Sequence, residues 1–400
     1  MQFKVRRSLK KDLTYNDAKR EIFSDEDFLK ELGPLINKKK IDIGYAKSKA
    51  DKYLKEISAR HSESRIFWIM TILLVRNKII QRFKKIHYNK KYVKKISNLL
   101  KNKVVAIAPN HRSVFDFIIL GYILIQETSF VPIILAAEVF NVFPIETIFR
   151  RWGAYFVRRS ETDEIYFLVF KHYVMLILKY ELIHMFFIEG GRNKTGGYSS
   201  PKKGILRHIL DGKKKFQPRK DLIFLPVNIS YDYVPESKIV VEEAKSGKRK
   251  HIFKSVINYL TGKNLGNCYI NFGEPISTSR LQRDVKSEDK LIDALGNSLM
   301  DKIKSLVIVS PTALLCYTLL NKNKINLVEL KKKFRINFEK LKSSKKNVAY
   351  VDLNKIMDYI LFADDKGIIK FDKDKQIIFV DSKQRHIVEY YSNNILHLFE

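Results

Sequence analysis

Short apolar runs alternate with longer stretches of helical periodicity through the middle of the chain, from about residue 91 to residue 280. Runs of this length are typical of buried strands, and stretches such as Phe167–Tyr180 are long enough to form helices. The alternation predicts an α/β fold with a mixed, largely parallel sheet flanked by helices. The predicted strands are Val104–Ala108, Phe130–Ala136, Ala154–Val157, Met185–Ile188 and Ile223–Ile229.

The N-terminal part of the chain has a different pattern. Residues 1–90 are rich in charge and mostly helical in period, with breaks predicted at Gly33–Pro34 and at Lys38–Lys40. We therefore divide the chain into a helical N-terminal region at 1–90, a central α/β unit at 91–310 and a C-terminal module at 311–400.

The C-terminal module begins at Pro311 and changes from helices to a hairpin. Leu327–Phe338 and Val351–Phe362 have helical patterns, and Gly367–Val380 has the pattern of a β-hairpin around a polar turn. This order predicts a small α/β module, either winged-helix-like or of another α/β type. A winged helix would favour a nucleic-acid partner, whereas a plain α/β appendage would not.

Charge is the strongest global signal in the composition. The 400 residues carry a formal net charge of +32, which predicts attraction to nucleic acid, an anionic membrane surface or phosphorylated substrates. The two cysteines, Cys268 and Cys316, lie far apart and have no metal-ligand spacing. We expect no disulfide framework, no metal site and, from the polar N-terminus, no secretory signal.

No segment has the pattern of a membrane span. Ile66–Val75 is apolar but ends at Arg76, which is too short to cross a bilayer. Phe130–Phe149 is long enough, yet four polar or proline positions interrupt it: Glu138, Asn141, Pro144 and Glu146. Both segments suit either an ordinary core or a shallow membrane-facing surface, and lysine pairs nearby favour peripheral binding to anionic lipid.

A histidine and an aspartate follow the first predicted strand of the central unit. His111 and Asp116 lie in the sequence Pro-Asn-His-Arg-Ser-Val-Phe-Asp, between the apolar runs Val104–Ala108 and Phe117–Leu124. Ser113 and Asp116 fit a helix N-cap and its N3 partner, which would place His111 in the loop and Asp116 in the first turn. An imidazole and a carboxylate in this arrangement can remove a proton from a hydroxyl group. A satisfied loop histidine and a capping aspartate would have the same spacing.

Two further motifs carry cationic side chains. Gly153 opens a short strand that ends in Arg158 and Arg159, and arginine at such a position suits a bidentate grip on phosphate or simply a solvated strand end. Another predicted strand leads into a glycine-rich loop. That loop contains Glu189, Gly190, Gly191, Arg192 and Lys194.

The sequence lacks both a nucleotide-binding phosphate loop and a serine hydrolase motif. Gly191 and Gly196 have the spacing of a phosphate-binding loop, but Gly197-Tyr198 follow where Lys and Ser or Thr are required. The chain has no Gly-x-Ser-x-Gly elbow, so a serine hydrolase of that type has no support. The remaining motif is a strand containing Pro226, Leu225–Tyr231.

Taken in order, the four motifs resemble those of the glycerolipid acyltransferase family. Its pattern is His-x4-Asp, Gly-x-x-Phe-Ile-x-Arg, Phe-x-Glu-Gly-x-Arg and a proline-containing strand. The details are most similar to the glycerol-3-phosphate and dihydroxyacetone-phosphate acyltransferase branch, and the resemblance runs from about residue 100 to the C-terminus. One departure is Arg192-Asn193-Lys194, where the family usually has Arg-Ser-Arg. The matching residues are His111 and Asp116; Gly153, Phe156 and Arg159; Phe187, Glu189, Gly190 and Arg192; and Pro226.

The resemblance implies that residues 91–310 are an acyltransferase domain. His111 would be the general base and Asp116 would orient it, while the acceptor phosphate would be held mainly by Arg159 and Arg192. Weaker implied contacts to the substrate come from the other polar and glycine positions of the motifs. These are Arg112, Arg158, Glu189, Gly190, Gly191 and Lys194.

The implied reaction is the acylation of the sn-1 hydroxyl of glycerol 3-phosphate by an acyl thioester, from either coenzyme A or acyl carrier protein, with no other cofactor. Dihydroxyacetone phosphate and lysophosphatidic acid are alternative acceptors. We expect peripheral or monotopic association with the cytoplasmic face of a cell membrane or another membrane. A basic nucleic-acid-binding protein is a distant alternative, since it explains the charge but not the ordered motifs, so we expect no specific nucleic acid. The sequence leaves the oligomeric state open.

Overall fold

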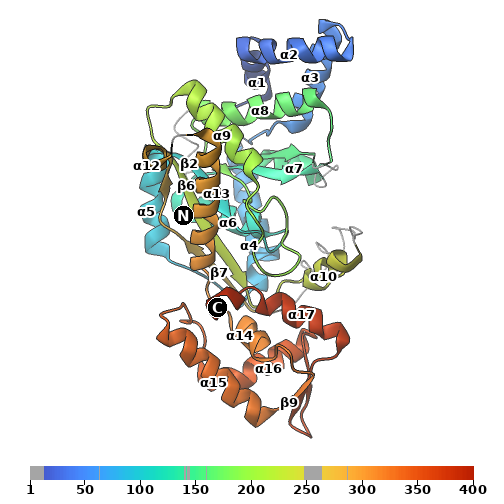
Figure 1. The fold of residues 1–400 in the computed structure, drawn as a ribbon, viewed down its shortest axis with the longest axis vertical. Helices are drawn as coiled ribbons and strands as arrows, with labels where there is room; N and C mark the ends of the chain where they lie inside the picture. The colour runs from blue at the N-terminus through green and yellow to red at the C-terminus, as the bar shows by residue number, and fades with distance from the viewer. Residues whose placement is uncertain are drawn as a thin grey trace.

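A mixed eight-stranded sheet forms the centre of the molecule in the computed structural model, which describes residues 13–62, 64–138, 141, 145–158, 160–246, 264–285 and 287–400 (Figure 1). The strand order is β1-β7-β6-β2-β5-β3-β4, with β8 paired to β6. All neighbours are parallel except that β7 and β8 run antiparallel to β6, which confirms the predicted fold class. The strands are β1 Lys85–Tyr88, β2 Val104–Pro109, β3 Ile133–Ala137, β4 Ala154–Val157, β5 His184–Met185, β6 Leu222–Tyr231, β7 Asn267–Phe272 and β8 Ile276–Ser277.

Helices cover both faces of the sheet because the strand side chains alternate between them. On β2, Val105 and Ile107 pack with α5 (Lys90–Asn102) and α6 (Asp116–Thr128). Val104, Ala106 and Ala108 face the opposite cluster. That cluster contains α8 (Glu164–Lys179), α9 (Lys203–Phe216) and α13 (Glu288–Ser305). Burial on both faces explains why the central strands are continuous apolar runs.

In the described part of the N-terminal region, the first three helices lie on α8, at the top of Figure 1. They are α1 (Tyr15–Phe23), α2 (Glu26–Lys39) and α3 (Ile43–Ile57), each capped by the side chain of Thr14, Asp25 or Asp42. The predicted break at Gly33–Pro34 is wrong, since α2 runs through Pro34 and ends beside the lysine run. The residue that terminates it is Lys40, in the left-handed conformation with φ 49°.

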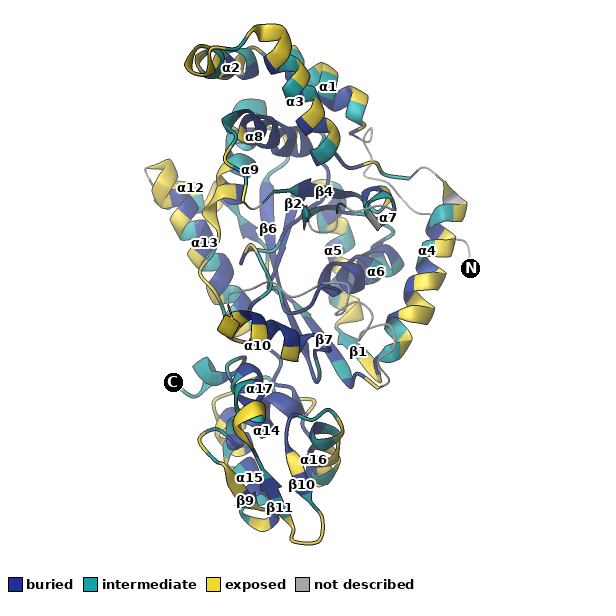
Figure 2. Ribbon diagram, turned by 90° about the vertical axis from the view of Figure 1, so that its right-hand side faces the viewer, coloured by how far each residue is buried: buried dark blue, intermediate teal, exposed yellow. Residues whose placement is uncertain are grey.

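The end of the predicted N-terminal region belongs to the central unit instead. β1 pairs in parallel with β7, so a strand of the main sheet lies within the stretch that was predicted to be helical. Before it come α4 (Arg65–Lys78) and the short 3₁₀ turn η1 (Ile80–Arg82). Figure 2 shows α4 beside α6 with much of its surface exposed. Among the described residues, no helix combines the length and the apolar composition needed to cross a bilayer.

The remaining helices of the central unit are short. They are α7 (Ile145–Arg151), which leads into β4, then α10 (Ser237–Ser246) after β6, and α12 (Thr278–Asp284) after β8. α10 packs against the last helix of the chain and so links the central unit to the C-terminal module.

The C-terminal module has the helix–strand–helix–helix–strand–strand order of a winged helix. Its three strands form an antiparallel sheet in the order β10-β11-β9. The last α-helix of the module, α17, lies on the side that faces the central unit (Figures 1 and 2). The elements are α14 Pro311–Thr318, β9 Lys324–Asn326, α15 Leu327–Ser343, η3 Leu353–Lys355, α16 Ile356–Asp365, β10 Lys370–Asp372, β11 Ile377–Phe379, α17 Ser382–Ser392 and η4 Leu396–Leu398.

Candidate active site

His111 and Asp116 meet at the carboxyl end of β2. The Nδ1 atom of His111 lies 2.9 Å from Oδ2 of Asp116. The predicted N-cap role of Ser113 is wrong, because α6 begins at Asp116 itself and has no side-chain cap. The backbone amides of Arg112 and Ser113 instead donate to Asp116 Oδ2, at 2.6 and 2.9 Å, so the carboxylate closes the loop that carries the histidine.

The Asp116 carboxylate is fully buried and has partners on both oxygens. Its second oxygen, Oδ1, accepts a hydrogen bond of 2.6 Å from the hydroxyl of Tyr231, at the end of the adjacent strand β6. A buried carboxylate with this many donors is held in one orientation. It therefore fixes the imidazole with Nδ1–H directed at the aspartate, which leaves Nε2 as the basic nitrogen.

The His111 ring is packed in a mostly apolar setting. It stacks on Phe187 with ring centroids 3.8 Å apart and an angle of 12° between the planes, and its side chain is 12% exposed. Burial lowers the pKa of His111, and the charge of Arg192 lowers it further, although Asp116 and Glu189 act in the opposite direction. The imidazole is thus neutral near pH 7, as a general base must be.

Glu189 links two loops by hydrogen bonds: the glycine-rich loop at residues 189–197 and the histidine loop at residues 110–115. Its Oε1 accepts from the backbone amide of His111 at 3.1 Å. Its Oε2 accepts from Asn193 Nδ2 and from the amide of Ser199, both at 2.9 Å. With both oxygens occupied and only 4% of the residue exposed, Glu189 shapes the loop. The amide of Asn193 completes the link by donating to the carbonyl of His111 at 2.9 Å.

The glycines of this loop allow close approach of other segments. Gly190 has φ +71°, and a Cβ there would lie 2.6 Å from Cγ of Lys202. At Gly196, with φ +80°, a Cβ would lie 1.7 Å from the carbonyl oxygen of Tyr390. The C-terminal segment therefore rests directly on the loop. Gly191 is partly exposed beside Arg192.

The cationic residues predicted to bind substrate fall into different environments. Arg192 is 13% exposed, with Nη2 at 3.7 Å from Glu243 Oε2 and with Nη1 buried and lacking a partner among the described residues. Lys194 is exposed on the same loop. Arg159 lies outside the described residues. Of the predicted cations that are described, Arg192 and Arg112 each combine burial near His111 with an unused donor. In Arg192 this donor is a terminal guanidinium nitrogen, Nη1, whereas in Arg112 it is Nε.

The two terminal nitrogens of Arg112 are occupied by contacts within the protein, and its buried Nε has no partner among the described residues. Its Nη1 donates to the carbonyls of Gly196 and Gly197, at 2.6 and 2.5 Å, and its Nη2 donates to Asn394 Oδ1 at 2.8 Å. The guanidinium also stacks over Tyr198, 4.6 Å from the ring centroid. It joins the histidine loop, the glycine-rich loop and the C-terminal segment.

Arg158 is also occupied, so its predicted contact with substrate has no support in the geometry. It lies at the end of β4 and forms ion pairs with Glu56 of α3 and with Glu161. The hydrogen bonds to Glu56 come first among the interactions that raise the pKa of Arg158. Its role in the fold is to hold the N-terminal helices to the sheet.

Two regions of the chain match known family models. The acyltransferase model matches residues 87–230, and the model of the glycerol-3-phosphate acyltransferase C-terminal region matches residues 250–400. The chain is therefore similar to the glycerol-3-phosphate acyltransferase branch of the glycerolipid acyltransferase family.

Curated members of this branch are similar along most of the chain. A glycerol-3-phosphate acyltransferase of Actinobacillus pleuropneumoniae serotype 5b (strain L20) is 28% identical over 391 residues, covering 90% of this chain and 46% of that protein. Those of Pseudoalteromonas translucida (strain TAC 125) and Pseudoalteromonas atlantica (strain T6c) are each 29% identical, over 90% and 96% of this chain and 47% and 49% of theirs. The chain spans about half the length of the curated relatives it matches.

One solved structure, a 1-acyl-sn-glycerophosphate acyltransferase from Thermotoga maritima, is 18% identical and has a TM-score of 0.32. The match covers 54% of this chain and 77% of that one. A score this low supports no argument about the fold or the site.

Three residues of the candidate site were not identified from the sequence. Tyr231 and Glu236 come from β6 and the loop after it, and Tyr390 comes from α17. Glu236 Oε1 accepts from Ser113 Oγ at 2.8 Å and from the amide of Val114 at 2.7 Å. Since β6 is adjacent to β2, residues at its carboxyl end were a recognisable signal.

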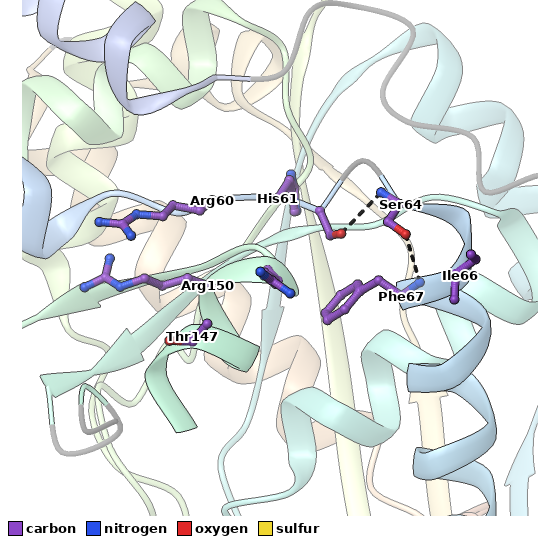
Figure 3. A pocket seen from close by; sticks show the side chains of 9 residues that line it. Arg60, His61, Ser64, Ile66, Phe67, Thr147 and Arg150 are labelled. Carbon is purple, nitrogen blue, oxygen red and sulfur yellow. Dashed lines mark hydrogen bonds between the residues drawn. The ribbon is translucent and has the colours of Figure 1, made fainter. Parts of the chain in front are cut away.

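Two cavities among the described residues lie outside this cluster. Figure 3 shows one of about 600 Å³ at the N-terminus of α4, lined by residues such as Arg60, His61, Phe67 and Arg150. An apolar one of about 40 Å³ lies between α4 and α6 and includes Trp68 and Phe117. No group of three or more potential metal ligands occurs within the part of the chain that the structure describes.

Proposed function

We propose that this chain transfers a fatty acyl group from an acyl thioester to the sn-1 hydroxyl of glycerol 3-phosphate. The observation that carries the proposal is the His111–Asp116 pair, at 2.9 Å, held beside the partly buried Arg192. The relatives named glycerol-3-phosphate acyltransferase support the choice of acceptor. The product would be lysophosphatidic acid, the first acylated intermediate of phospholipid synthesis.

The reaction needs one base and no covalent enzyme intermediate. His111 Nε2 removes the hydroxyl proton as the oxygen attacks the thioester carbonyl, and Asp116 stabilises the imidazolium that forms. The tetrahedral intermediate then collapses and the C–S bond breaks. The leaving thiolate takes the proton from the His111 imidazolium, which regenerates the neutral base. One ester and one thiol result, with no change in oxidation state and no cofactor beyond the thioester substrate.

The acceptor phosphate requires cationic partners that the fold leaves unused. Arg192 meets this requirement through its free Nη1 donor. We propose Arg159 and the exposed Lys194 as further contacts, on the basis of the resemblance alone. Coenzyme A and acyl carrier protein are both acidic donors that the net charge of +32 would attract.

A membrane would be the natural site of this reaction, since its product is a lipid. We propose that α4 lies on the bilayer surface, because its exposed apolar residues recur at helical spacing and basic residues follow at its C-terminal end. The five apolar side chains, each at least 45% exposed, are Ile66, Ile69, Met70, Leu73 and Leu74.

The first experiment is thioester-dependent acylation by the purified protein in anionic lipid. Glycerol 3-phosphate, dihydroxyacetone phosphate and lysophosphatidic acid serve as parallel acceptors, and coenzyme A and carrier-protein thioesters as donors. Acylation of glycerol 3-phosphate that is lost in His111→Ala supports the proposal. Acylation of only one of the other acceptors would replace the assigned substrate, and no product with any pair would reject the function.

Vesicle sedimentation tests the membrane surface independently of activity. Leu74→Glu should weaken binding to anionic vesicles, since it places a charge on the proposed contact face. Ile336→Glu is a matched control, because Ile336 on α15 is 57% exposed and Leu74 is 55% exposed. Equal binding of the two variants would argue against α4 as the contact.

The winged-helix topology is the structural feature that most favours a nucleic-acid-binding function for this chain. The negative charge of α16 argues against that function. The third helix of such a module is the one that would enter a groove, yet α16 carries Asp358, Asp364 and Asp365. Carboxylates facing phosphates would weaken binding. We therefore propose no specific nucleic-acid partner.

A further inference from the structure

The hydroxyl of Tyr390 is buried and has no hydrogen-bond partner among the described residues. Only 3% of the residue is exposed, so water does not readily satisfy the group. A buried hydroxyl without a partner is costly and uncommon in a folded protein. Tyr390 therefore requires an explanation that its neighbour Tyr391 does not. The Tyr391 hydroxyl accepts from the amide of Val234 at 2.9 Å and donates to Ser237 Oγ at 3.4 Å.

Three other buried polar atoms near the candidate site lack partners in the described structure. They are Nη1 of Arg192, Oε2 of Glu236 and Nε of Arg112, whose other two nitrogens bind within the protein. Glu236 is fully buried and uses its other oxygen to hold Ser113 and Val114. The Arg192 Nη1 atom can only donate a hydrogen bond, whereas the Glu236 Oε2 atom, as a carboxylate oxygen, accepts one.

Contacts of Glu236, and of the residues next to Arg192 and near Tyr390, place all three around the histidine loop. Asn193, next to Arg192, bonds to His111, and Ser113 bonds to Glu236. Tyr390 is placed by two contacts of the C-terminal segment. Arg112, next to His111, donates a hydrogen bond to Asn394, four residues after Tyr390. The backbone carbonyl of Tyr390 itself packs against Gly196 of the glycine-rich loop.

Electrostatic interactions agree with this placement. Burial raises the pKa of Tyr390, Arg112 and Arg192 lower it, and Glu236 and Asp116 raise it. Charges that influence the same hydroxyl lie close to it.

The unused atoms of Arg192, Tyr390 and Glu236 together describe a ligand. Arg192 and Tyr390 offer donors, which an anionic oxygen would satisfy. Glu236 offers an acceptor, which a hydroxyl group would satisfy. A molecule with an oxyanion and a free hydroxyl meets both needs, and a polyol phosphate has this chemistry. A simple fatty acid has no such hydroxyl.

We propose that Tyr390, supplied by the C-terminal segment, binds the acceptor phosphate together with Arg192, while Glu236 accepts a hydrogen bond from the acceptor's second hydroxyl. The proposal rests on the function proposed above and deepens it. It makes the C-terminal segment part of the acceptor site and makes Glu236 the residue that distinguishes glycerol 3-phosphate from dihydroxyacetone phosphate. The latter has a carbonyl in place of that hydroxyl and cannot donate.

Tyr390→Phe tests the phosphate contact, because it removes only the hydroxyl. We expect the KM for glycerol 3-phosphate to rise about 10- to 100-fold, as for loss of a hydrogen bond to a charged group, with the KM for the acyl donor unchanged. The Tm should not fall, since the hydroxyl has no partner to lose. Tyr391→Phe is the matched control and should lower the Tm without changing the KM.

Two results would overturn the role of Tyr390. One is an unchanged KM for glycerol 3-phosphate in Tyr390→Phe, and the other is an equal rise in the KM of both substrates, which would indicate general damage. A double-mutant cycle with Arg192→Ala adds a further condition. If both residues hold the same phosphate, their effects on KM should not be additive, and full additivity would argue against a shared ligand.

Glu236→Gln tests the discrimination between acceptors. The variant should reduce the preference for glycerol 3-phosphate over dihydroxyacetone phosphate in kcat/KM, and an unchanged ratio would contradict the role of Glu236.

The rise in Tm on addition of glycerol 3-phosphate measures binding without turnover, so it distinguishes failure of the binding site from failure of the proposed function. If the wild-type protein shows no acylation, the proposed function fails. Stabilisation of the wild type but not of Tyr390→Phe would still support the binding site, and equal shifts would reject it.

Discussion

Arg192 and Arg158 both lie just beyond a strand of the same sheet, and their surroundings differ. Arg158, after β4, has its guanidinium enclosed by Glu56 and Glu161. Arg192, after β5, reaches one carboxylate at 3.7 Å and keeps a buried donor without a partner in the described structure. The first arginine is engaged in the fold and the second is available to a ligand.

The comparison shows that partners decide what a cation in a motif does. An arginine that is already bonded to two carboxylates must lose those bonds before it can bind phosphate, which costs about as much as the new contact contributes. An arginine with an unpaired buried donor gains a bond on binding. The region around His111 is therefore expected to control catalysis, and the region around Arg158 to control stability.

The largest effect should come from His111→Ala. Removal of a general base lowers kcat by about 10² to 10⁴. The Tm and the circular dichroism spectrum should stay close to those of the wild type, because Asp116 keeps its bonds to two backbone amides and Tyr231. Turnover within a few-fold of the wild type would remove His111 from the chemistry.

The comparison of the two arginines is tested directly by Arg192→Ala and Arg158→Ala. Loss of Arg192 should raise the KM for glycerol 3-phosphate by about 10- to 100-fold, since it removes a charged hydrogen bond to the acceptor. Loss of Arg158 should leave that KM unchanged and lower the Tm. Steady-state kinetics and thermal unfolding of both variants are sufficient, and a raised KM in Arg158→Ala would break the distinction.

The pH profile gives a smaller but more specific effect. Burial lowers the pKa of His111 below its ordinary value of 6.5, so the neutral base persists as the pH falls and kcat/KM should decline only below that value. Arg192 contributes to the lowering, so in Arg192→Ala the acidic limb should move to higher pH. In Arg158→Ala the limb should stay in place. A limb that moves equally in both variants would show that Arg192 does not act on His111 directly.

The smallest effect is expected for Glu56→Gln. The pair with Arg158 is partly exposed, at 31% and 22%, so solvent screens it and its loss should cost about 1 kcal/mol or less. Chemical denaturation measures this difference, with activity as the control. A loss of activity at unchanged stability would mean that the end of β4 takes part in the reaction after all.

The fold was predictable where a segment's own pattern decides its structure. Ala154–Val157 forms β4 with the predicted bounds, and the predicted Val104–Ala108 strand differs from β2 by one residue. The structure differs from the prediction where contacts between distant parts of the chain determine whether a strand forms. β1 exists because β7 offers it a parallel partner far along the chain, and the predicted Met185–Ile188 strand is shortened to β5, His184–Met185. Isolated apolar residues cannot reveal such pairings.

The site was predictable in part for the same reason. His111 and Asp116 are five residues apart, so their contact depends on one loop and could be inferred from the sequence. Glu236 bonds to a residue 123 positions away, and Asn394 to one 282 positions away. No local signal indicated these contacts, although the place of β6 beside β2 would have suggested Tyr231.

The sequence by itself determined the order of the motifs, the alternation that builds the sheet and the loop that joins a base to its carboxylate. These depend on residues close together along the chain, where periodicity and short spacings limit the possible geometry. Only the tertiary structure decided which arginines are consumed by the fold, which glycines lie against another segment and which buried polar atoms lack a partner. Those properties depend on what lies opposite a side chain, and the chain reaches that neighbour only after it has folded.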